Sequence, residues 1–146
     1  MPTINEAGLK LVQNFEGCRL TAYDDGTGVM TIGYGHTGGV YRGQTITQAE
    51  AIKFLEKDLE SAERAVSQGL KTIVNPNQFS AMVSLCFNIG DSAFLGSSVL
   101  RETNQRNWEA AANAFLSWDD RGYPEQAGLD RRRQAERSLY LQDLPK

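Results

Sequence analysis

The sequence predicts an α+β fold in which a short β-prone segment is followed by a larger helical part. Apolar residues recur at helical spacing near the N-terminus, lose that period between residues 19 and 46, and regain it from residue 47 onward. The chain has 146 residues, enough for one domain that buries roughly two thirds of its unfolded surface. We therefore expect a single domain over residues 1–146, with a β lobe at about residues 17–46.

The N-terminal segment predicts a helix over about residues 4–15. Thr3-Ile4-Asn5-Glu6 has the pattern of a capping box, in which a hydroxyl and a carboxylate satisfy free amides at a helix start. An apolar stripe follows, and Gly17 suits the position just after a helix end. This places Glu16 at the C-terminus of the predicted helix.

The β lobe is predicted from two β-prone runs, RLTAY and VMTIGY, on either side of Asp24-Asp25-Gly26-Thr27-Gly28. Aspartate and glycine are typical of tight turns. A third extended piece, VYRGQTI, ends just before residue 47. We therefore expect a β-hairpin or a three-stranded sheet.

The rest of the chain predicts helices. Thr47-Gln48-Ala49-Glu50 is a second capping box, and the apolar stripe behind it predicts one long linking helix over about residues 47–68. Asn75-Pro76 opens the next helix, which Gly90 closes. The helical lobe should cover about residues 75–141 together with the N-terminal helix, with further helices at about 92–104, 108–118 and 129–141 and a loop at 119–128.

Composition limits the partners and the compartment. The net charge is −3 and there is no basic tail, which argues against nucleic acid as a partner. No apolar run reaches the roughly 18 residues of a membrane span, so we expect no membrane insertion. Cys18 and Cys86 have no disulfide or metal-site spacing, which predicts free thiols. The N-terminus lacks the pattern of a secretory signal, which predicts that the chain is made and stays in the cytoplasm.

Three residues around the predicted turn could act together in catalysis. Unpaired carbonyl groups at a helix C-terminus disfavour an ionised carboxylate, so Glu16 could keep its proton and act as a general acid. The alternative is an exposed glutamate at a frayed helix end. Asp25 and Thr31 are ordinary residues for a turn and a strand. Across a tight turn, however, they come close enough to hold one water molecule.

Glycoside hydrolysis uses one protonated carboxylic acid for the leaving oxygen and one carboxylate on the opposite side of the sugar. Glu16 and Asp25 can fill these roles. The spacing Glu16-x8-Asp25-x5-Thr31 continues into TIGYGH, and FNIG, Trp118 and GLDRRRQAERSLY follow later in the chain. With these motifs nearly the whole sequence resembles the phage-type lysozymes, the endolysins that form family 24 of the glycoside hydrolases.

The resemblance implies a lysozyme-like fold, in which a small β lobe and a larger helical lobe are joined by a long helix. It implies hydrolysis of the β-1,4 bond between N-acetylmuramic acid and N-acetylglucosamine in peptidoglycan, with inversion, for lysis of a phage host and without metal or cofactor. Glu16 would be the general acid, and Asp25 with Thr31 would position or activate water. Asp24 is the nearby alternative to Asp25, but the motif spacing selects Asp25.

The resemblance also implies supporting residues. His36 is the only histidine, and we expect it to pair with Asp58 rather than to act as an acid or base. Arg132 and Arg133 have the spacing for ion pairs with Glu136 within one helix. The resemblance places this segment behind the catalytic acid, so we expect one of the two arginines to anchor Glu16. Such a contact favours the ionised carboxylate and opposes the effect of the helix end.

We expect six residues to contact the sugar. Three of them follow the catalytic hairpin: Tyr34, Gly35 and Thr37. The other three, together with Trp118, resemble family positions that line the cleft or its floor: Phe87, Asn88 and Ser98. A sugar could approach closely at Gly35. Aromatic side chains at helical spacing usually pack in a core, so packing is favoured over sugar contact for Phe87 and Trp118. Ser98 fits a helix cap equally well.

Two other functions stay open. A lytic transglycosylase needs a single glutamate and uses the muramic 6-hydroxyl in place of water, whereas the presence of both Asp25 and Thr31 favours hydrolysis. A silent peptidoglycan-binding module would keep the fold, but it would not need the acid pair. We expect a monomer that reaches the cell wall and periplasm only after a separate, holin-like protein has permeabilised the membrane.

Overall fold

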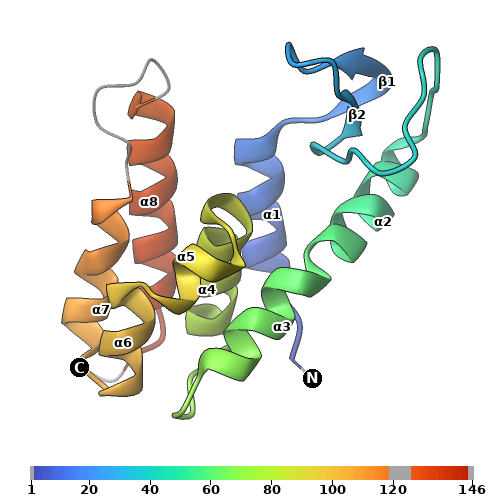
Figure 1. Ribbon diagram of the computed structural model, residues 1–146. Helices are drawn as coiled ribbons and strands as arrows, with labels where there is room; N and C mark the ends of the chain where they lie inside the picture. The colour runs from blue at the N-terminus through green and yellow to red at the C-terminus, as the bar shows by residue number, and fades with distance from the viewer. Residues whose placement is uncertain (1, 119–125, 145–146) are drawn as a thin grey trace. The chain divides into compact units, whose positions relative to one another are not determined.

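The computed structural model describes residues 2–118 and 126–144 (Figure 1). The chain divides into two compact units, a β unit of residues 13–60 and a helical unit of residues 1–12 and 61–146. The elements in chain order are α1 (Glu6–Glu16), β1 (Arg19–Asp24), β2 (Met30–Gly33), α2 (Gln48–Asp58), α3 (Glu60–Gly69), α4 (Pro76–Ile89), α5 (Asp91–Leu95), α6 (Ser98–Asn104), α7 (Trp108–Ala114), the 3-10 helix η1 (Phe115–Ser117) and α8 (Gln126–Leu141).

Helix α1 begins later than the sequence predicts. Its cap is Asn5, whose Oδ1 accepts the Gly8 amide at 2.9 Å, and not Thr3. The backbone amides of Ile4 and Asn5 are instead bound by side chains of the same unit, at 2.7 Å by Glu63 and at 2.9 Å by Ser80. These long-range bonds hold the chain extended before the helix starts, which a local capping pattern cannot reveal.

The end of α1 agrees with the prediction. Gly17 has φ 70°, the left-handed conformation that favours glycine, and its amide donates to the Gln13 carbonyl at 3.1 Å. Glu16 is therefore the last helical residue, followed at once by the turn into β1.

Strands β1 and β2 form an antiparallel pair in which Tyr23 lies opposite Thr31. The register is irregular between Arg19 and Tyr23. The third extended piece makes only an isolated bridge between Thr21 and Thr45, so the sheet in the described residues has two strands rather than three. A turn that joins the Gln44 amide to the Tyr41 carbonyl at 3.1 Å bends this piece away from a full strand.

Helix α2 packs on β2 within the β unit. A Cβ atom on Gly33, which has φ 65°, would lie 3.4 Å from the Cβ atom of Ala51. The space would admit a Cβ atom, so it is the left-handed backbone conformation that favours glycine here. The apolar core of the unit includes the fully buried side chains of Ile32 and Leu59.

The predicted long helix is two helices. The capping box at Thr47 and Glu50 is present, with both reciprocal bonds. However, α2 ends at Asp58 and α3 starts at Glu60, and Leu59 between them keeps right-handed helical angles. The apolar stripe continues through Leu59 without glycine or proline, so the spacing gives no signal of this interruption.

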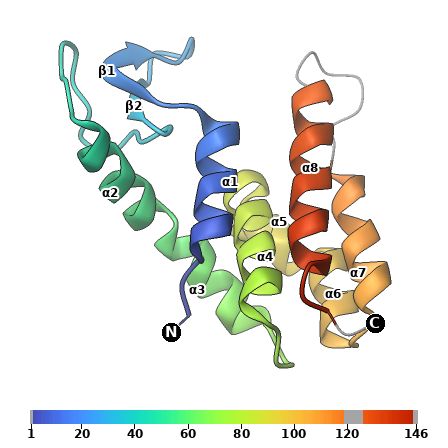
Figure 2. The ribbon, with the colours of Figure 1, turned by 180° about the vertical axis from the view of Figure 1, so that it is seen from behind.

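Helix α4 is the centre of the helical unit and lies between α3 and α8 in both views (Figures 1 and 2). Its residues 78–86 are all buried, as expected of a helix that other helices surround. Asn75 caps it as predicted, and Pro76 is its first residue.

The predicted helix over residues 92–104 is divided at Gly96, and Ser97 caps the second part, α6. Helix α7 and η1 together cover residues 108–117 of the helix predicted at 108–118. Residues 119–125 of the loop predicted at 119–128 lie outside the described residues. Residues 126–128 belong to α8, which therefore starts three residues before the helix predicted at 129–141.

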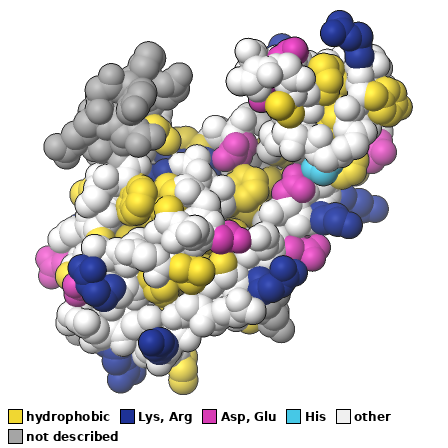
Figure 3. All heavy atoms as spheres, in the orientation of Figure 1, with side chains coloured by type: hydrophobic (Ala, Val, Ile, Leu, Met, Phe, Trp, Pro, Cys, Tyr) yellow, Lys and Arg dark blue, Asp and Glu magenta, His cyan; other side chains and the backbone are white. Residues whose placement is uncertain are grey.

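On the face drawn in Figure 3, acidic and basic side chains are interspersed rather than gathered by sign. Among residues 2–118 and 126–144, no helix is long and apolar enough to cross a membrane. The same residues contain no cluster of three or more histidine, cysteine, aspartate or glutamate side chains placed to hold a metal ion.

Candidate active site

The β unit contains all three residues predicted to be catalytic. Glu16 ends α1 and is half-buried. A Cβ atom on Gly35 would lie 3.8 Å from Glu16 Oε1, so the carboxyl group lies beside the backbone that leaves β2. Because Gly35 has no side chain, the space next to the carboxyl group stays open.

Asp25 follows β1 in the hairpin turn and is exposed. Its Oδ1 accepts the Thr27 hydroxyl at 2.6 Å, the Thr27 amide at 2.8 Å and the Val29 amide at 3.4 Å. These bonds, above all the one from the Thr27 hydroxyl, hold the pKa of Asp25 below its ordinary value. The carboxylate is therefore ionised at neutral pH.

Thr31 lies on the same side of the hairpin as Asp25. It is directly opposite Tyr23 in the ladder, and Asp25 is two residues beyond Tyr23, so the three side chains share one face. Thr31 is only 4% exposed, and its hydroxyl donates to the Val29 carbonyl at 3.2 Å. An ionised carboxylate and a fixed hydroxyl thus lie as diagonal neighbours across the two strands.

Asp24 has a different environment from Asp25. Its Oδ1 accepts the amides of Gly26 at 2.8 Å and Gly28 at 3.0 Å. Both bonds close the turn, and Asp24 lies opposite Met30 on the other face of the ladder. Both aspartates thus accept amides of the turn and differ in the face of the ladder on which they lie, so the choice of Asp25 over Asp24 stays a prediction from the motif spacing.

His36 makes the contact expected with Asp58. Its Nδ1 lies 2.8 Å from Asp58 Oδ2, and its Nε2 lies 2.9 Å from the Gly38 carbonyl. The imidazole ring also stacks on Phe54, with ring centroids 4.4 Å apart. Both ring nitrogens and one ring face are thus occupied by groups of the β unit, an arrangement that favours a structural role.

The residues after β2 differ in exposure. Tyr34 is buried, and its hydroxyl accepts bonds from Gln13 at 3.1 Å and from Gln48. Tyr34 therefore ties α1 to α2, a contact that favours the structural alternative for this residue. Gly35 and Thr37 are exposed and accessible to a ligand. The two glutamines were not among the predicted site residues, because nothing local in the sequence links them to Tyr34.

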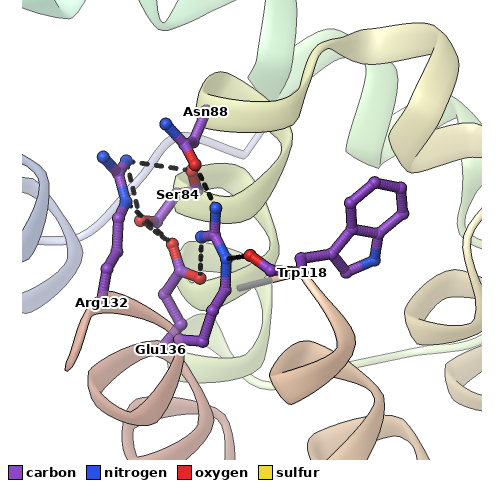
Figure 4. Close-up of polar contacts among 6 residues, drawn as sticks. Ser84, Asn88, Trp118, Arg132 and Glu136 are labelled. Atoms are coloured by element: carbon purple, nitrogen blue, oxygen red, sulfur yellow. Dashed lines mark hydrogen bonds and ion pairs between the residues drawn. The ribbon is translucent and has the colours of Figure 1, made fainter. Parts of the chain in front are cut away.

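The helical unit holds a buried polar network between α4 and α8 (Figure 4). Glu136 binds Arg133 Nη1 at 2.6 Å and Arg132 Nε at 3.2 Å, so both predicted intrahelical pairs are present. Ser84 donates its hydroxyl to Glu136 at 2.5 Å. All three charged residues are at least 97% buried, so the network lies in the core of the helical unit.

Arg133 extends the network to the end of α4. It donates to the Trp118 carbonyl at 2.7 Å and to the side-chain oxygen of Asn88 (Figure 4). Asn88 is thus held by a protein partner, and Phe87 beside it is half-buried. Ser98 is exposed but is not the cap of α6, because Ser97 provides that bond to the Leu100 amide at 3.3 Å. The N-cap alternative for Ser98 is therefore wrong.

Glu16 belongs to the β unit, whereas Arg132 and Arg133 belong to the helical unit. Anchoring of Glu16 by one of these arginines stays a prediction. Ser84 was not predicted to take part in the network, since a serine on the buried face of a helix carries no sequence signal of such a role.

Comparisons with known proteins identify the family of the chain. The family model of phage lysozyme matches residues 13–136. The endolysin of Salmonella phage P22 is 44% identical over 146 residues, which cover 97% of this chain and 99% of that protein. A SAR-endolysin of bacteriophage PS119 is 35% identical over 127 residues, which cover 86% of this chain and 76% of the relative.

Solved structures confirm the expected lysozyme-like α+β fold. The muramidase domain of SpmX from Asticaccaulis excentricus superposes with a TM-score of 0.89 and 39% sequence identity, covering 99% of this chain and 100% of that domain. The protein therefore belongs to the phage lysozyme family and is a lysozyme-type glycoside hydrolase.

Proposed function

We propose that the protein is an endolysin-type muramidase that hydrolyses the β-1,4 bond between N-acetylmuramic acid and N-acetylglucosamine in bacterial peptidoglycan. The observation that carries the proposal is the hairpin face on which an ionised Asp25 lies diagonally across from Thr31. Glu16 belongs to the same compact unit. This set supplies the two carboxyl groups that glycoside hydrolysis requires.

In the proposed mechanism, Glu16 donates its proton to the glycosidic oxygen as the bond to the anomeric carbon breaks. Asp25 and Thr31 hold a water molecule, which attacks the anomeric carbon and transfers a proton to Asp25. One water is consumed, and two sugar hydroxyl groups are formed. Direct attack by water inverts the anomeric configuration, and NMR of the first product anomer tests this step.

The other predicted site residues have distinct proposed roles. Gly35, which lies beside Glu16, and the exposed Thr37 would contact the sugar. Three residues of the helical unit would also contact it: Phe87, Asn88 and Ser98. Tyr34 contributes by fixing the residues around it. The pair of His36 and Asp58 would hold the backbone that leaves β2, and Arg132 or Arg133 would anchor Glu16.

The decisive experiment measures reducing-sugar release from purified peptidoglycan. We expect Glu16→Gln and Asp25→Asn to lose at least about 100-fold in rate, as is typical for removal of a general acid or base. Asp24→Asn is the matched control, because it changes the neighbouring carboxylate on the other face. Equal activity of all variants, or loss only in Asp24→Asn, would overturn the assignment.

Lytic transglycosylase activity is the main alternative reaction. It leaves anhydromuramic ends, whereas hydrolysis leaves reducing ends that carry one added water. Mass spectrometry of the released fragments separates the two outcomes. A silent binding module would bind the wall and release no fragments.

Delivery to the wall is tested separately. We expect a monomer that accumulates in the host cytoplasm and acts after another protein, of the holin type, has permeabilised the membrane. Expression alone should then leave cells intact, and permeabilisation should lyse them. Lysis on expression alone would show that the chain reaches the wall by itself.

A further inference from the structure

An arginine and a tyrosine extend the proposed catalytic face along β1. The Arg19 guanidinium carbon lies 4.3 Å from the centroid of the Tyr23 ring. This is the geometry of a cation–π contact. The contact places the cationic group over Tyr23 even though the register between these two residues is irregular.

Tyr23 is the link between this cation and the proposed catalytic residues. It lies directly opposite Thr31, and Asp25 is two residues further along the chain. Because a strand rises about 3.3 Å per residue, the guanidinium over Tyr23 lies roughly 7 Å along the strand from Asp25. That separation is comparable to the width of one sugar ring with its substituent.

Arg19 is exposed, and its stacked guanidinium is restricted in orientation. Stacking uses the flat face of the group and leaves the N–H donors at its edge accessible. Within the described part of the chain, no carboxylate forms an ion pair with Arg19. In contrast, Arg132 and Arg133 are buried and donate to groups of the helical unit. Arg19 is thus a preorganised, accessible donor for an external carboxylate.

We propose that Arg19, held by the Tyr23 ring, binds a carboxylate of the peptide stem carried by the muramic acid next to the bond that is cleaved. The inference rests on the proposed function, which supplies a glycan with acidic peptide substituents. Paired N–H donors of a guanidinium match the two oxygens of a carboxylate. Arg19 therefore selects acidic muramyl glycans over neutral ones and contributes to KM rather than to the bond-breaking step.

The test compares two substrates, intact peptidoglycan and the same peptidoglycan with its carboxylates converted to amides. For wild type we expect amidation to raise KM about tenfold, the effect of one lost charge-assisted hydrogen bond pair. Arg19→Ala should show this raised KM already on intact peptidoglycan and respond little to amidation. Arg19→Lys keeps the charge but lacks the planar guanidinium, so its KM on intact peptidoglycan should lie between those of wild type and Arg19→Ala.

Two further variants separate this contact from general charge effects. Arg42→Ala removes another exposed arginine of the β unit and should respond to amidation as wild type does. Tyr23→Leu removes the ring under the guanidinium and should raise KM on intact peptidoglycan. Circular dichroism and thermal unfolding establish that each variant is folded.

Parallel responses of wild type and Arg19→Ala to amidation would overturn the inference, as would an effect confined to kcat. These outcomes differ from failure of the proposed function, in which wild type releases no reducing sugar from intact peptidoglycan.

Discussion

At the scale of single residues, the ionisation of Asp25 depends on its neighbour Thr27. The Thr27 hydroxyl makes the largest contribution to the lowered pKa of Asp25. Thr27→Val removes this hydroxyl and nearly preserves the side-chain volume. We expect the pKa of Asp25 to rise toward its ordinary value. Since the proposed reaction requires the ionised carboxylate, the acid limb of the pH profile of kcat/KM should move to higher pH.

Thr21→Val is the matched control, because Thr21 is an exposed threonine of β1 outside the turn. The acid limb of the kcat/KM profile of Thr21→Val should coincide with that of wild type. NMR titration of the Asp25 carboxyl carbon gives an independent measurement. An acid limb that stays in place in Thr27→Val would show that another group controls it.

The pair of His36 and Asp58 gives a second prediction. The contact is 2.8 Å long and only partly exposed, and the ring also stacks on Phe54. We expect His36→Asn and Asp58→Asn to destabilise non-additively, with a coupling free energy of about 1 kcal/mol at pH 6 in a double-mutant cycle. Urea unfolding measures all four proteins. Strictly additive losses would mean that the two side chains act independently.

At the scale of elements, Glu136 joins α8 to α4 through two guanidinium groups and the Ser84 hydroxyl. Glu136→Gln keeps the size of this side chain and removes the charge that both arginines share. Because buried cations are then left without their partner, we expect a loss of about 3–5 kcal/mol in the free energy of unfolding. Denaturant unfolding measures this loss in Glu136→Gln and in the exposed control Glu109→Gln. Equal free energies of unfolding for the two variants would contradict the prediction.

Local sequence patterns predict a helix start well where residues of the first turn satisfy the free backbone amides themselves. The caps at Thr47 and Asn75 are present as expected, since each requires only residues three apart. The cap of α1 was misplaced at Thr3 because long-range bonds to Glu63 and Ser80 decide where that helix starts. The division at Leu59 was missed because the apolar period continues through it.

At the scale of the whole molecule, the proposed acid pair was readable from the sequence because both carboxyl groups and Thr31 fall within one short segment, which folds into a single compact unit. The supporting contacts are of another kind. Tyr34 with Gln48, and Ser84 with Glu136, join residues that only the tertiary fold brings together. The expectation of one cooperative domain over residues 1–146 stays a prediction.

The two cysteines offer a test of that cooperativity. Burial, and then the Asp91 carboxylate that accepts a hydrogen bond from the thiol, raise the pKa of Cys86 far above its ordinary value, whereas Cys18 is exposed in the β unit. We expect iodoacetamide to modify Cys18 alone in the native protein. Mass spectrometry follows the labelling, and Cys18→Ser should remain unlabelled until the helical unit opens. Rapid native labelling of Cys86 would contradict this.

Cys86 labelling then measures the opening of the helical core directly. If both units form one cooperative domain, the rate of Cys86 labelling should follow global unfolding across denaturant concentrations. A rate that rises before the global transition would mean that the helical unit opens separately.

The bond from Thr31 to the Val29 carbonyl also fixes the polarity of the proposed water site. The only hydrogen of that hydroxyl is already used within the hairpin, and an ionised Asp25 has none, so both groups can only accept. A water between them must direct both of its hydrogens at the protein, which turns its lone pairs outward. The two hairpin groups that cannot donate a hydrogen bond would thus orient the nucleophilic lone pairs of the proposed water away from the protein.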